Sequence, residues 1–498
     1  MKKKALLILI AILVFGLFLR LFKLNQLFHF TMDEALIAFR ALGLFRYNRP
    51  FLIGGISPLQ VHLPPYFYYL AAILLTPFKF NPAGWGIWAA VFSLFTITAL
   101  YLLTKKLFNQ KIALLTSLLY ATSFTPVFFD RHFWPLNLNP LLTLLALLLL
   151  TKLKQKSPWP YLALGILMAF ILTTDPSNIP LILAVVVYSI INLRKLSQKF
   201  LIRQYLAAAA VFFVPLLAFD LRHNWQNFSG ITKLFQTASQ LQFSWPKLLD
   251  ALLLLPRSLA RFWYSPQTDL VKLYSYCIPY ADSRQHHLPL ALVILAVVIL
   301  LWFLKQTYQS QKPLLKTIAF LIVFYLLGIL LFGALGYSIF DHYLAGLLPI
   351  FALLTALFLT QLPKLAKLLL LSVLVITNLY QISQARHPYG FTYKQQLVSW
   401  ANQELQGQDY ALDSISKCHR ENGLRYLFEL TDNPPKISFM DPNFFWLYQQ
   451  PPAQTIPDKV LLVTDKPLTT NLPILTRQQF GHMAAYILDN SNHLYQFN

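Results

Sequence analysis

The stretch ALLILIAILVFGLFL, residues 5–19, decides the fold of this chain. Three lysines stand directly before it, and Arg20 and Lys23 follow it, so the span that we expect is residues 5–22. This length is close to the run of about 20 apolar residues that a helix needs to cross a bilayer. No cleavage site of small residues follows, so we interpret the run as an uncleaved signal anchor with its lysines in the cytoplasm.

The composition of the whole chain points the same way. Of its 498 residues, 56% are hydrophobic and only 12% are charged, which is too apolar for a soluble protein of this size. We therefore predict a mainly α-helical, polytopic membrane protein with about 11 or 12 transmembrane helices. The expected spans are residues 5–22, 84–104, 111–129, 136–153, 159–174, 177–193, 203–220, 287–304, 315–336, 344–361 and 364–384. A further apolar stretch, residues 64–80, begins with two prolines, and whether it crosses the membrane stays open.

Basic residues indicate the orientation of these spans in the cell membrane. The formal net charge is +22, but lysines and arginines gather in short loops, which is the positive-inside pattern and not a nucleic-acid-binding surface. The basic residues expected in the cytoplasm are Lys2–Lys4, Lys105, Lys106, Lys111, Lys152, Lys154, Lys156, Arg194, Lys195, Lys199, Arg203, Lys305, Lys312, Lys316, Lys364 and Lys367. All of these basic residues can lie in the cytoplasm only if residues 64–80 do not cross from one side of the membrane to the other. Eleven crossings then place the C-terminus outside the cytoplasm.

Acidic residues follow the opposite rule. Residues 1–387 contain nine acids, and in this topology each one lies at an outer span end or in an outer loop. They are Asp33, Glu34, Asp130, Asp175, Asp220, Asp250, Asp269, Asp282 and Asp341. The positive-inside rule says little about acids, so we interpret this segregation as an active or binding surface on the outer side. The alternative is that outer loops simply tolerate acids.

The composition changes after the last span. We expect residues 1–387 to form the transmembrane domain, with an outer loop at residues 24–83, and residues 388–498 to form a small α/β domain outside the cytoplasm. KVLLVTD (459–465) predicts a buried strand, and ENGLRYLFEL (421–430) predicts a helix or a strand with one apolar face.

Two features of the remaining chain carry less information. In the long outer loop, LLDALLLLPRSLARFWY (248–264) predicts an interfacial helix that is broken at Pro256. The chain has two cysteines, Cys277 and Cys418, which are too few for a disulfide framework and predict two unrelated thiols.

The first candidate for chemistry is FTMDEALIAF, residues 30–39, in the first outer loop. Asp33 and Glu34 are adjacent, and adjacent residues on a helix point about 100° apart, so only one carboxylate can face a given pocket. A carboxylate near the membrane surface can serve as a general base for a hydroxyl group. The alternative is a helix start at which acids are favoured by the positive end of the helix dipole.

Four other polar segments lie at expected outer span ends. They are QVHLPPYFYYL (60–70) with His62 and Tyr66, FDRHFWPLNLNP (129–140) with Asp130 and Arg131, FDLRHNW (219–225) with Arg222 and His223, and FDHYLAGLLPIF (340–351) with His342 and Tyr343. An aspartate beside Arg or His recurs in three of them, which favours a shared polar site. Arginine suits a phosphate because its planar fork donates two parallel hydrogen bonds. The alternatives are an aromatic belt at the interface and a snorkelling arginine paired with Asp130.

The order of these motifs resembles one family. An N-terminal span, the outer-loop Asp33-Glu34, HLPPYFYYL (62–70), an arginine before an Asn- and Pro-rich turn (131–140) and HYLAGLLP (342–349) are similar to the membrane-embedded C-type glycosyltransferases of family 39, the protein-mannosyltransferase and aminoarabinose-transferase kind. The resemblance covers about residues 1–385. The sequence contains no P-loop, GxGxxG, HExxH, GxSxG or CxxC motif, so nucleotide-driven transport and hydride chemistry have no support.

The resemblance implies an activity and roles for these residues. It implies that a sugar moves, with inversion, from a polyprenyl-phosphate carrier to a lipid, glycan or protein acceptor on the outer face of the cell envelope. Asp33 would be the catalytic carboxylate, with Glu34 beside it. The residues expected to bind substrate, including the cations for the leaving phosphate, are His62, Tyr66, Asp130, Arg131, Arg222, His223, His342 and Tyr343.

The sequence also departs from the family, and it leaves alternatives. Many members carry an acid shortly after the arginine of the third motif, whereas asparagines follow Arg131 here and Asp130 precedes it. We assign no cofactor, although two carboxylates and a histidine could bind a divalent cation. A transporter or flippase of lipid-linked saccharides would share the apolar chain but would place polar groups near mid-membrane and show repeat symmetry. A receptor or scaffold would explain only the outer domain.

Overall fold

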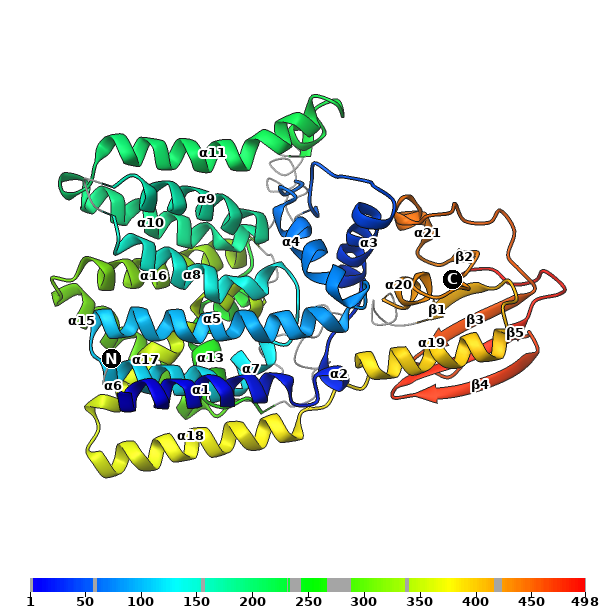
Figure 1. The fold of residues 1–498 in the computed structure, drawn as a ribbon. Helices are drawn as coiled ribbons and strands as arrows, with labels where there is room; N and C mark the ends of the chain where they lie inside the picture. Colours follow the sequence, from blue (N-terminus) through cyan, green and yellow to red (C-terminus); the bar gives the residue numbers. More distant parts are fainter. Residues whose placement is uncertain are drawn as a thin grey trace.

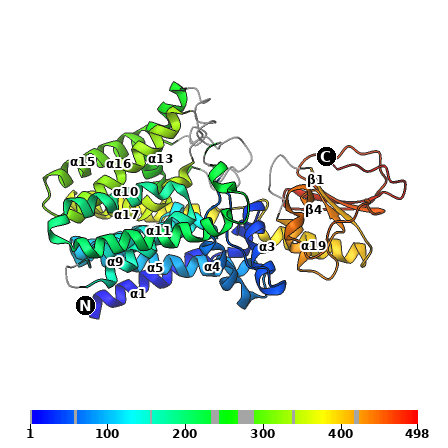
Figure 2. The ribbon, with the colours of Figure 1, turned by 90° about the horizontal axis from the view of Figure 1, so that it is seen from above.

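The computed structural model shows a helical bundle with a small mixed domain at one end (Figures 1 and 2). It describes residues 3–56, 61–153, 157–230, 232, 243–266, 288–335, 340–415 and 423–497. Cys277, Cys418, Asp269 and Asp282 lie outside these residues. The N-terminus lies at the end of the bundle that faces away from the C-terminal domain (Figure 1).

Most of the long helices of the bundle run roughly parallel to one another, whereas α3 and α4 are inclined to them (Figure 1). The helices of the first half are α1 (Lys3–Leu21), α2 (Leu24–Leu27), α3 (Met32–Arg46), α4 (Tyr66–Leu75), α5 (Ala83–Leu107), α6 (Gln110–Thr122), α7 (Phe124–Phe129), α8 (Asn139–Leu150), α9 (Trp159–Thr174) and α10 (Ile179–Ile191). Those of the second half are α11 (Gln198–Asp220), α13 (Trp245–Trp263), α15 (Leu290–Gln309), α16 (Pro313–Ala334), α17 (Leu348–Gln361) and α18 (Lys364–Gln384). Short 3-10 turns join several of them, among them η1 (Thr76–Phe78), η2 (Pro135–Leu138), η3 (Pro176–Asn178), η4 (Leu193–Lys195) and η6 (Asp341–Leu347).

These helices are long and apolar enough for a membrane protein. Among the described residues, seven helices reach spanning length, and four shorter apolar helices accompany them. Each of the eleven spans expected from the sequence overlaps a helix of the structure, although residues 111–129 are divided at Ser123 between α6 and α7. The prediction of a mainly helical, polytopic membrane protein with a small C-terminal α/β domain is confirmed.

The stretch with an open fate, residues 64–80, forms α4 and the short turn η1. Ten helical residues rise only about 15 Å, which is half of the hydrocarbon thickness. Helix α4 packs against α3, α5 and α9, and its buried residues include Phe67 and Leu75.

Helix α13 differs from its prediction. It runs unbroken through Pro256, and most of its residues from Leu254 to Trp263 are buried against α15, α16 and α17. The predicted break and the surface position are therefore wrong. Proline removes one backbone hydrogen bond, but the packing of the buried half holds the helix together.

The C-terminal domain is a five-stranded sheet with helices beside it. Its strands are β1 (Ala411–Ile415), β2 (Ile437–Ser438), β3 (Lys459–Thr464), β4 (Ile474–Phe480) and β5 (Met483–Asp489), in the order β2-β1-β3-β5-β4. Strands β2, β1 and β3 are parallel, whereas β5 is antiparallel to both β3 and β4. The helices are α19 (Phe391–Leu405), α20 (Leu424–Glu429) and α21 (Asp441–Phe444), which is followed by the turn η7 (Phe445–Leu447). The segment KVLLVTD forms β3, and ENGLRYLFEL contains α20.

The C-terminal domain docks onto the segment between α1 and α5. Lys394 is fully buried and donates a hydrogen bond of 2.5 Å to the carbonyl of Phe30, and Tyr426 Oη donates one of 2.8 Å to the carbonyl of Phe80. Gly390 approaches α2 so closely that a Cβ atom there would lie 2.0 Å from the carbonyl oxygen of Gln26. These contacts hold the segment that leads into α3 against the C-terminal domain.

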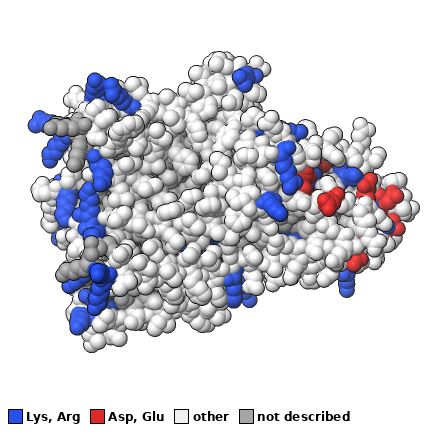
Figure 3. Space-filling view, in the orientation of Figure 1, with Lys and Arg blue, Asp and Glu red and all other residues white. Residues whose placement is uncertain are grey.

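Charge is distributed along the long axis of the molecule. Figure 3 shows lysines and arginines gathered at the end of the bundle opposite the C-terminal domain, and acids on the surface of that domain. The two ends therefore differ in the way that the positive-inside rule favours for a cytoplasmic and an outer side.

Candidate active site

The site begins at the N-terminus of α3, where Glu34 is buried. Its Oε2 accepts hydrogen bonds from the backbone N–H of Thr31 (2.8 Å) and from Thr31 Oγ1 (3.0 Å), and its Oε1 bonds to His132 Nε2. The first of these is half of a capping box, which explains why a helix starts here. Burial raises the pKa of Glu34, but the charge and hydrogen bond of His132, then His29 and Thr31, outweigh it and hold the pKa well below its usual range.

Asp33 lies one residue earlier in a different environment. Its side chain is exposed, yet protein surrounds it closely enough for desolvation, helped by the charge of Glu34, to raise its pKa to about 6 against the opposing charge of His132. Tyr68 of α4 lies close enough to interact with the Asp33 carboxylate. Asp33 is therefore accessible to another molecule and has a raised pKa, whereas Glu34 is buried and has a lowered pKa.

Two further histidines complete the buried cluster. His29 Nδ1 lies 3.0 Å from His387 Nε2, and the ring of His29 meets the ring of His132 edge-on at a centroid distance of 4.9 Å. His29, Glu34 and His132 each offer one ligand atom, and these three atoms lie within 4.8 Å of one another. Two imidazoles and a carboxylate are donors that zinc accepts. A cation here would be held by Glu34 and not by Asp33.

Asp130 and Arg131 anchor the end of α1. Asp130 Oδ2 pairs with the buried guanidinium of Arg20, at 3.0 Å from Nε and 2.8 Å from Nη2. Arg131 donates from Nε to the carbonyl of Arg20 at 3.1 Å and from Nη2 to the carbonyl of Leu19. Asp130 thus pairs with Arg20, and Tyr120 Oη donates a hydrogen bond of 3.4 Å to its other carboxylate oxygen. These contacts hold the chain in place before it enters the loop to Asp33.

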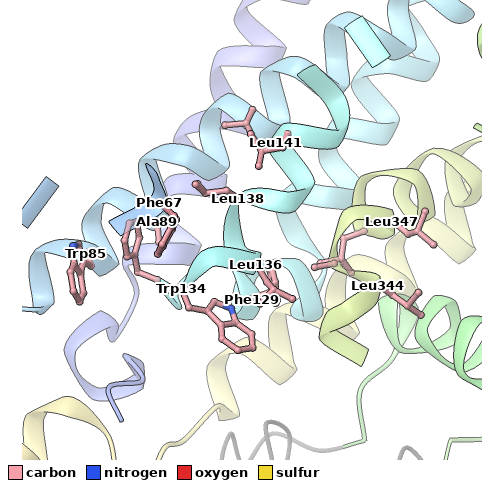
Figure 4. Packing of buried hydrophobic residues seen from close by; sticks show 14 of the residues in the cluster. Phe67, Trp85, Ala89, Phe129, Trp134, Leu136, Leu138, Leu141, Leu344 and Leu347 are labelled. Atoms are coloured by element: carbon pink, nitrogen blue, oxygen red, sulfur yellow. The ribbon is translucent and has the colours of Figure 1, made fainter. Parts of the chain in front are cut away.

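The loop between α7 and α8 carries His132 and is held by aromatic packing. The ring of Phe133 stacks on Trp85 and on Phe67, at centroid distances of 5.3 and 5.7 Å. Trp134 stacks on His132 at 4.8 Å and meets His342 edge-on at 4.9 Å. Figure 4 shows Trp134, Leu136 and Leu138 of this loop among side chains of α4, α5 and η6.

The structure therefore brings His342 to the His132 loop through Trp134. Tyr343 lies beside His342, with ring centroids 4.6 Å apart. His342 and Tyr343 thus join the surroundings of the cluster through ring contacts.

A second group of predicted site residues lies near the end of α11. It consists of His62, Arg222 and His223. The backbone N–H of His62 donates to Asn227 Oδ1 at 3.0 Å, and the backbone N–H of Asn227 donates to Asp220 Oδ1 at 2.8 Å. His223 stacks on Phe219, and Arg222 is exposed. Burial, together with the charge of Arg40, lowers the pKa of His62.

Arg40 links this second group of residues with the site at the start of α3. Its guanidinium lies over the rings of Tyr68 (5.1 Å), Phe51 (5.4 Å) and Trp446 (5.4 Å), and it donates to the carbonyl of Ile53 at 2.6 Å. Tyr68 in turn lies within electrostatic reach of Asp33.

Tyr66 has a structural partner. Its hydroxyl donates a hydrogen bond of 2.6 Å to the carbonyl of Val211 in α11. That carbonyl is four residues before Pro215, which lies inside the helix and has no N–H to donate to it. Tyr66 thus replaces the missing hydrogen bond.

Sequence reasoning misses several residues of this site. His29, His387 and Arg40 receive no role from any motif, whereas Arg20 enters only as the end of the first span and Tyr68 only as part of the aromatic run in residues 60–70. The pattern Thr31-x-x-Glu34 is a capping-box signature and could have shown that Glu34 turns inward. His387 has no such signal, because it lies 358 residues from His29.

Comparisons with known proteins bear on the fold and on part of the sequence. Residues 62–219 match the family model of the dolichyl-phosphate-mannose-protein mannosyltransferases. No curated protein matches the chain.

Solved structures match the whole chain. The crystal structure of ArnT from Cupriavidus metallidurans bound to undecaprenyl phosphate is similar with a TM-score of 0.58, at 11% identity over 100% of both chains. The apo state of the same protein gives a TM-score of 0.56, at 12% identity over 99% of both chains. The oligosaccharyltransferase from Archaeoglobus fulgidus gives 0.50, at 13% identity, over 88% of this chain and 64% of that one.

At these identities the structural matches establish the fold alone. The match to the family model concerns only residues 62–219 of this chain. The chain has the fold of the membrane-embedded C-type glycosyltransferases, and the resemblance to this family that its sequence predicts is confirmed.

Proposed function

We propose that this protein is an inverting glycosyltransferase that moves a sugar from a polyprenyl-phosphate carrier to an acceptor on the outer face of the membrane. The observation that carries the proposal is that two adjacent carboxylates lie in different environments. Asp33 is exposed with its pKa raised to about 6, whereas Glu34 is buried and accepts three hydrogen bonds. A general base is most effective when its pKa lies near the working pH.

The chemistry assigns Asp33 the role of base. It accepts the proton of the acceptor hydroxyl as the oxygen attacks the anomeric carbon, and the bond to the lipid phosphate breaks on the opposite face. A single displacement of this kind inverts the anomeric carbon. The leaving phosphate is already anionic and needs cations more than a proton. Exposed Arg222 is the cation that we assign to it.

The carrier class rests on the shared fold. The ArnT structure of the same fold holds undecaprenyl phosphate, which is a polyprenyl phosphate. We place the acceptor and the Asp33 loop on the outer side, because α3, whose first turn contains Asp33, lies at the end of the bundle that bears the C-terminal domain, opposite the basic end.

The test is a panel of polyprenyl-phosphate sugars added to the purified protein in lipid. Release of the lipid phosphate is measured, and the anomeric configuration of the product is read by NMR. We expect release with at least one donor, an inverted product, and loss of release in Asp33→Asn. The competing function is a flippase of lipid-linked saccharides. Movement of a labelled donor across vesicle membranes without release of its phosphate, unchanged in Asp33→Asn, would favour that function and overturn ours.

A further inference from the structure

The buried histidines near Asp33 form a hydrogen-bond chain whose direction can be read from one fixed donor. The backbone N–H of Tyr389 lies 3.2 Å from His387 Nδ1. A backbone N–H can only donate, so this ring nitrogen must be an acceptor. His387 is therefore neutral, and its hydrogen is on Nε2.

The same reasoning passes to the next residue. His387 Nε2–H points to His29 Nδ1 at 3.0 Å, so that nitrogen is also an acceptor and the hydrogen of His29 is on Nε2. His29 Nε2 lies 3.4 Å from Thr31 Oγ1, which itself donates to Glu34 Oε2 at 3.0 Å. Every donor in this chain meets one acceptor.

The chain joins two parts of the molecule that are distant in sequence. His387 follows α18 and precedes the C-terminal domain, and Glu34 lies next to Asp33 in the first outer loop. His29, Thr31, Glu34 and His387 are each less than 8% exposed, so water does not substitute for these contacts. Buried hydrogen bonds of this kind fix geometry because each lost partner leaves a buried polar group without compensation.

The positions of the hydrogens in this chain also decide whether the cluster of His29, Glu34 and His132 can bind a cation. A metal on His29 would need the lone pair of Nε2, which holds the hydrogen here. Moving that hydrogen to Nδ1 would force His387 to carry its own on Nδ1, against the N–H of Tyr389. The cluster of His29, Glu34 and His132 therefore suits hydrogen bonding better than a cation.

We propose that His387 is a positioning residue, which acts through His29, Thr31 and Glu34 to hold the first turn of α3 and with it the Asp33 carboxylate. The proposal rests on the function proposed above for Asp33. It assigns to the segment that leads into the C-terminal domain a part in the reaction, although that segment does not touch the reacting atoms.

Two substitutions of His387 separate its contacts. In His387→Asn the amide oxygen can replace Nδ1 and keep the bond to the N–H of Tyr389, but the side chain is too short to reach His29. In His387→Gln the amide nitrogen can replace Nε2 and restore that donor. We expect kcat to fall about tenfold or more in the Asn variant, with the KM for the lipid donor unchanged, and to return close to the wild-type value in the Gln variant.

Two controls make the comparison specific. His482→Ala removes an exposed histidine whose ring meets Tyr389 edge-on at 5.8 Å but which is outside the chain, and it should leave kcat unchanged. In the double variant His29→Ala with His387→Asn, the loss in kcat should be no larger than in His29→Ala alone, because both residues act in one chain. An additive loss, or a wild-type kcat in His387→Asn, would overturn the proposal.

A spectroscopic readout does not depend on activity. Histidine labelled with nitrogen-15 in the membrane-reconstituted protein should show His29 and His387 as neutral rings with hydrogen on Nε2, assigned by the signals lost in the two variants. A hydrogen on Nδ1 of His29, or one zinc ion retained per chain with His29 as ligand, would overturn the chain. If no donor is turned over at all, the function proposed above fails, while this measurement still decides the direction of the hydrogen bonds.

Discussion

Asp33 and Glu34 are adjacent in the chain, but the side chain of Asp33 is exposed and that of Glu34 is buried. Because only Asp33 is accessible, Asp33→Asn should lower kcat by roughly 100- to 10,000-fold without loss of donor binding. Glu34→Gln should lower kcat less and instead reduce the free energy of unfolding by about 1–3 kcal/mol, since it weakens buried hydrogen bonds to a charged group. Steady-state kinetics and thermal unfolding of both variants check this. A wild-type rate in Asp33→Asn would make the carboxylate structural.

The raised pKa of Asp33 has two consequences for pH dependence. A base must be ionised, so kcat/KM should fall below pH about 6, with a slope of one. In the folded protein this pKa lies above its ordinary value of 3.8, so the contribution of Asp33 to stability is greatest below that value and is lost as the pH rises through about 6. Asp33→Asn should therefore raise the melting temperature relative to wild type more at pH 8 than at pH 5. An equal difference at both pH values would contradict the shift.

The two arginines of the predicted phosphate site should respond differently to Lys. Arg222 is exposed, so Arg222→Lys keeps the charge but loses the fork, and we expect a higher KM for the lipid donor. Arg131 is buried and donates to two carbonyls of α1, so Arg131→Lys should lower the melting temperature. Donor titrations and unfolding curves measure both. Unchanged donor use in Arg222→Lys would make it an ordinary boundary arginine.

At the scale of elements, α11 depends on a side chain from another helix. Tyr66 donates to the carbonyl that Pro215 leaves without its helical partner. Tyr66→Phe should lower the free energy of unfolding by about 1 kcal/mol and leave transfer unchanged. Tyr380→Phe, in an exposed tyrosine of α18, is the matched control and should change neither. A raised donor KM with normal stability would show instead that Tyr66 binds substrate.

The start of α3 also depends on other elements. The carbonyl of Phe30 accepts from the buried Lys394, the carbonyl of Phe28 accepts from the N–H of Phe391, and His29 bonds to His387. The loop that leads to Asp33 is thus held at three consecutive residues by the segment that leads into the C-terminal domain and by α19.

At the scale of the whole molecule, the basic end and the C-terminal domain lie at opposite ends of the bundle (Figure 3). Asn48 and Gln450 should therefore be accessible from one side of the membrane and Asn109 from the other. Single cysteines at these exposed positions, in a background with Cys277→Ser and Cys418→Ser, can be labelled in intact cells with a reagent that does not cross the membrane. Labelling of positions 48 and 109 from the same side would contradict the topology.

The sequence by itself determined the fold class and the helices. Runs of about 17–22 apolar residues are a local signal, because each span satisfies its own backbone hydrogen bonds within the membrane. The charge of the loops is also local, and it therefore predicts an orientation. The choice of Asp33 over Glu34 as the candidate carboxylate came instead from the resemblance of its motif to the family, and it stays a prediction.

Only the tertiary structure decided which polar groups meet. Asp130 pairs with Arg20 of α1, Tyr66 donates to a carbonyl of α11, and α13 continues through Pro256. His387 joins His29 across 358 residues, a contact that no spacing or period in the sequence encodes. The physical reason is that apolar periodicity specifies which face of a helix is buried, whereas the partner of a buried polar group depends on how distant segments pack.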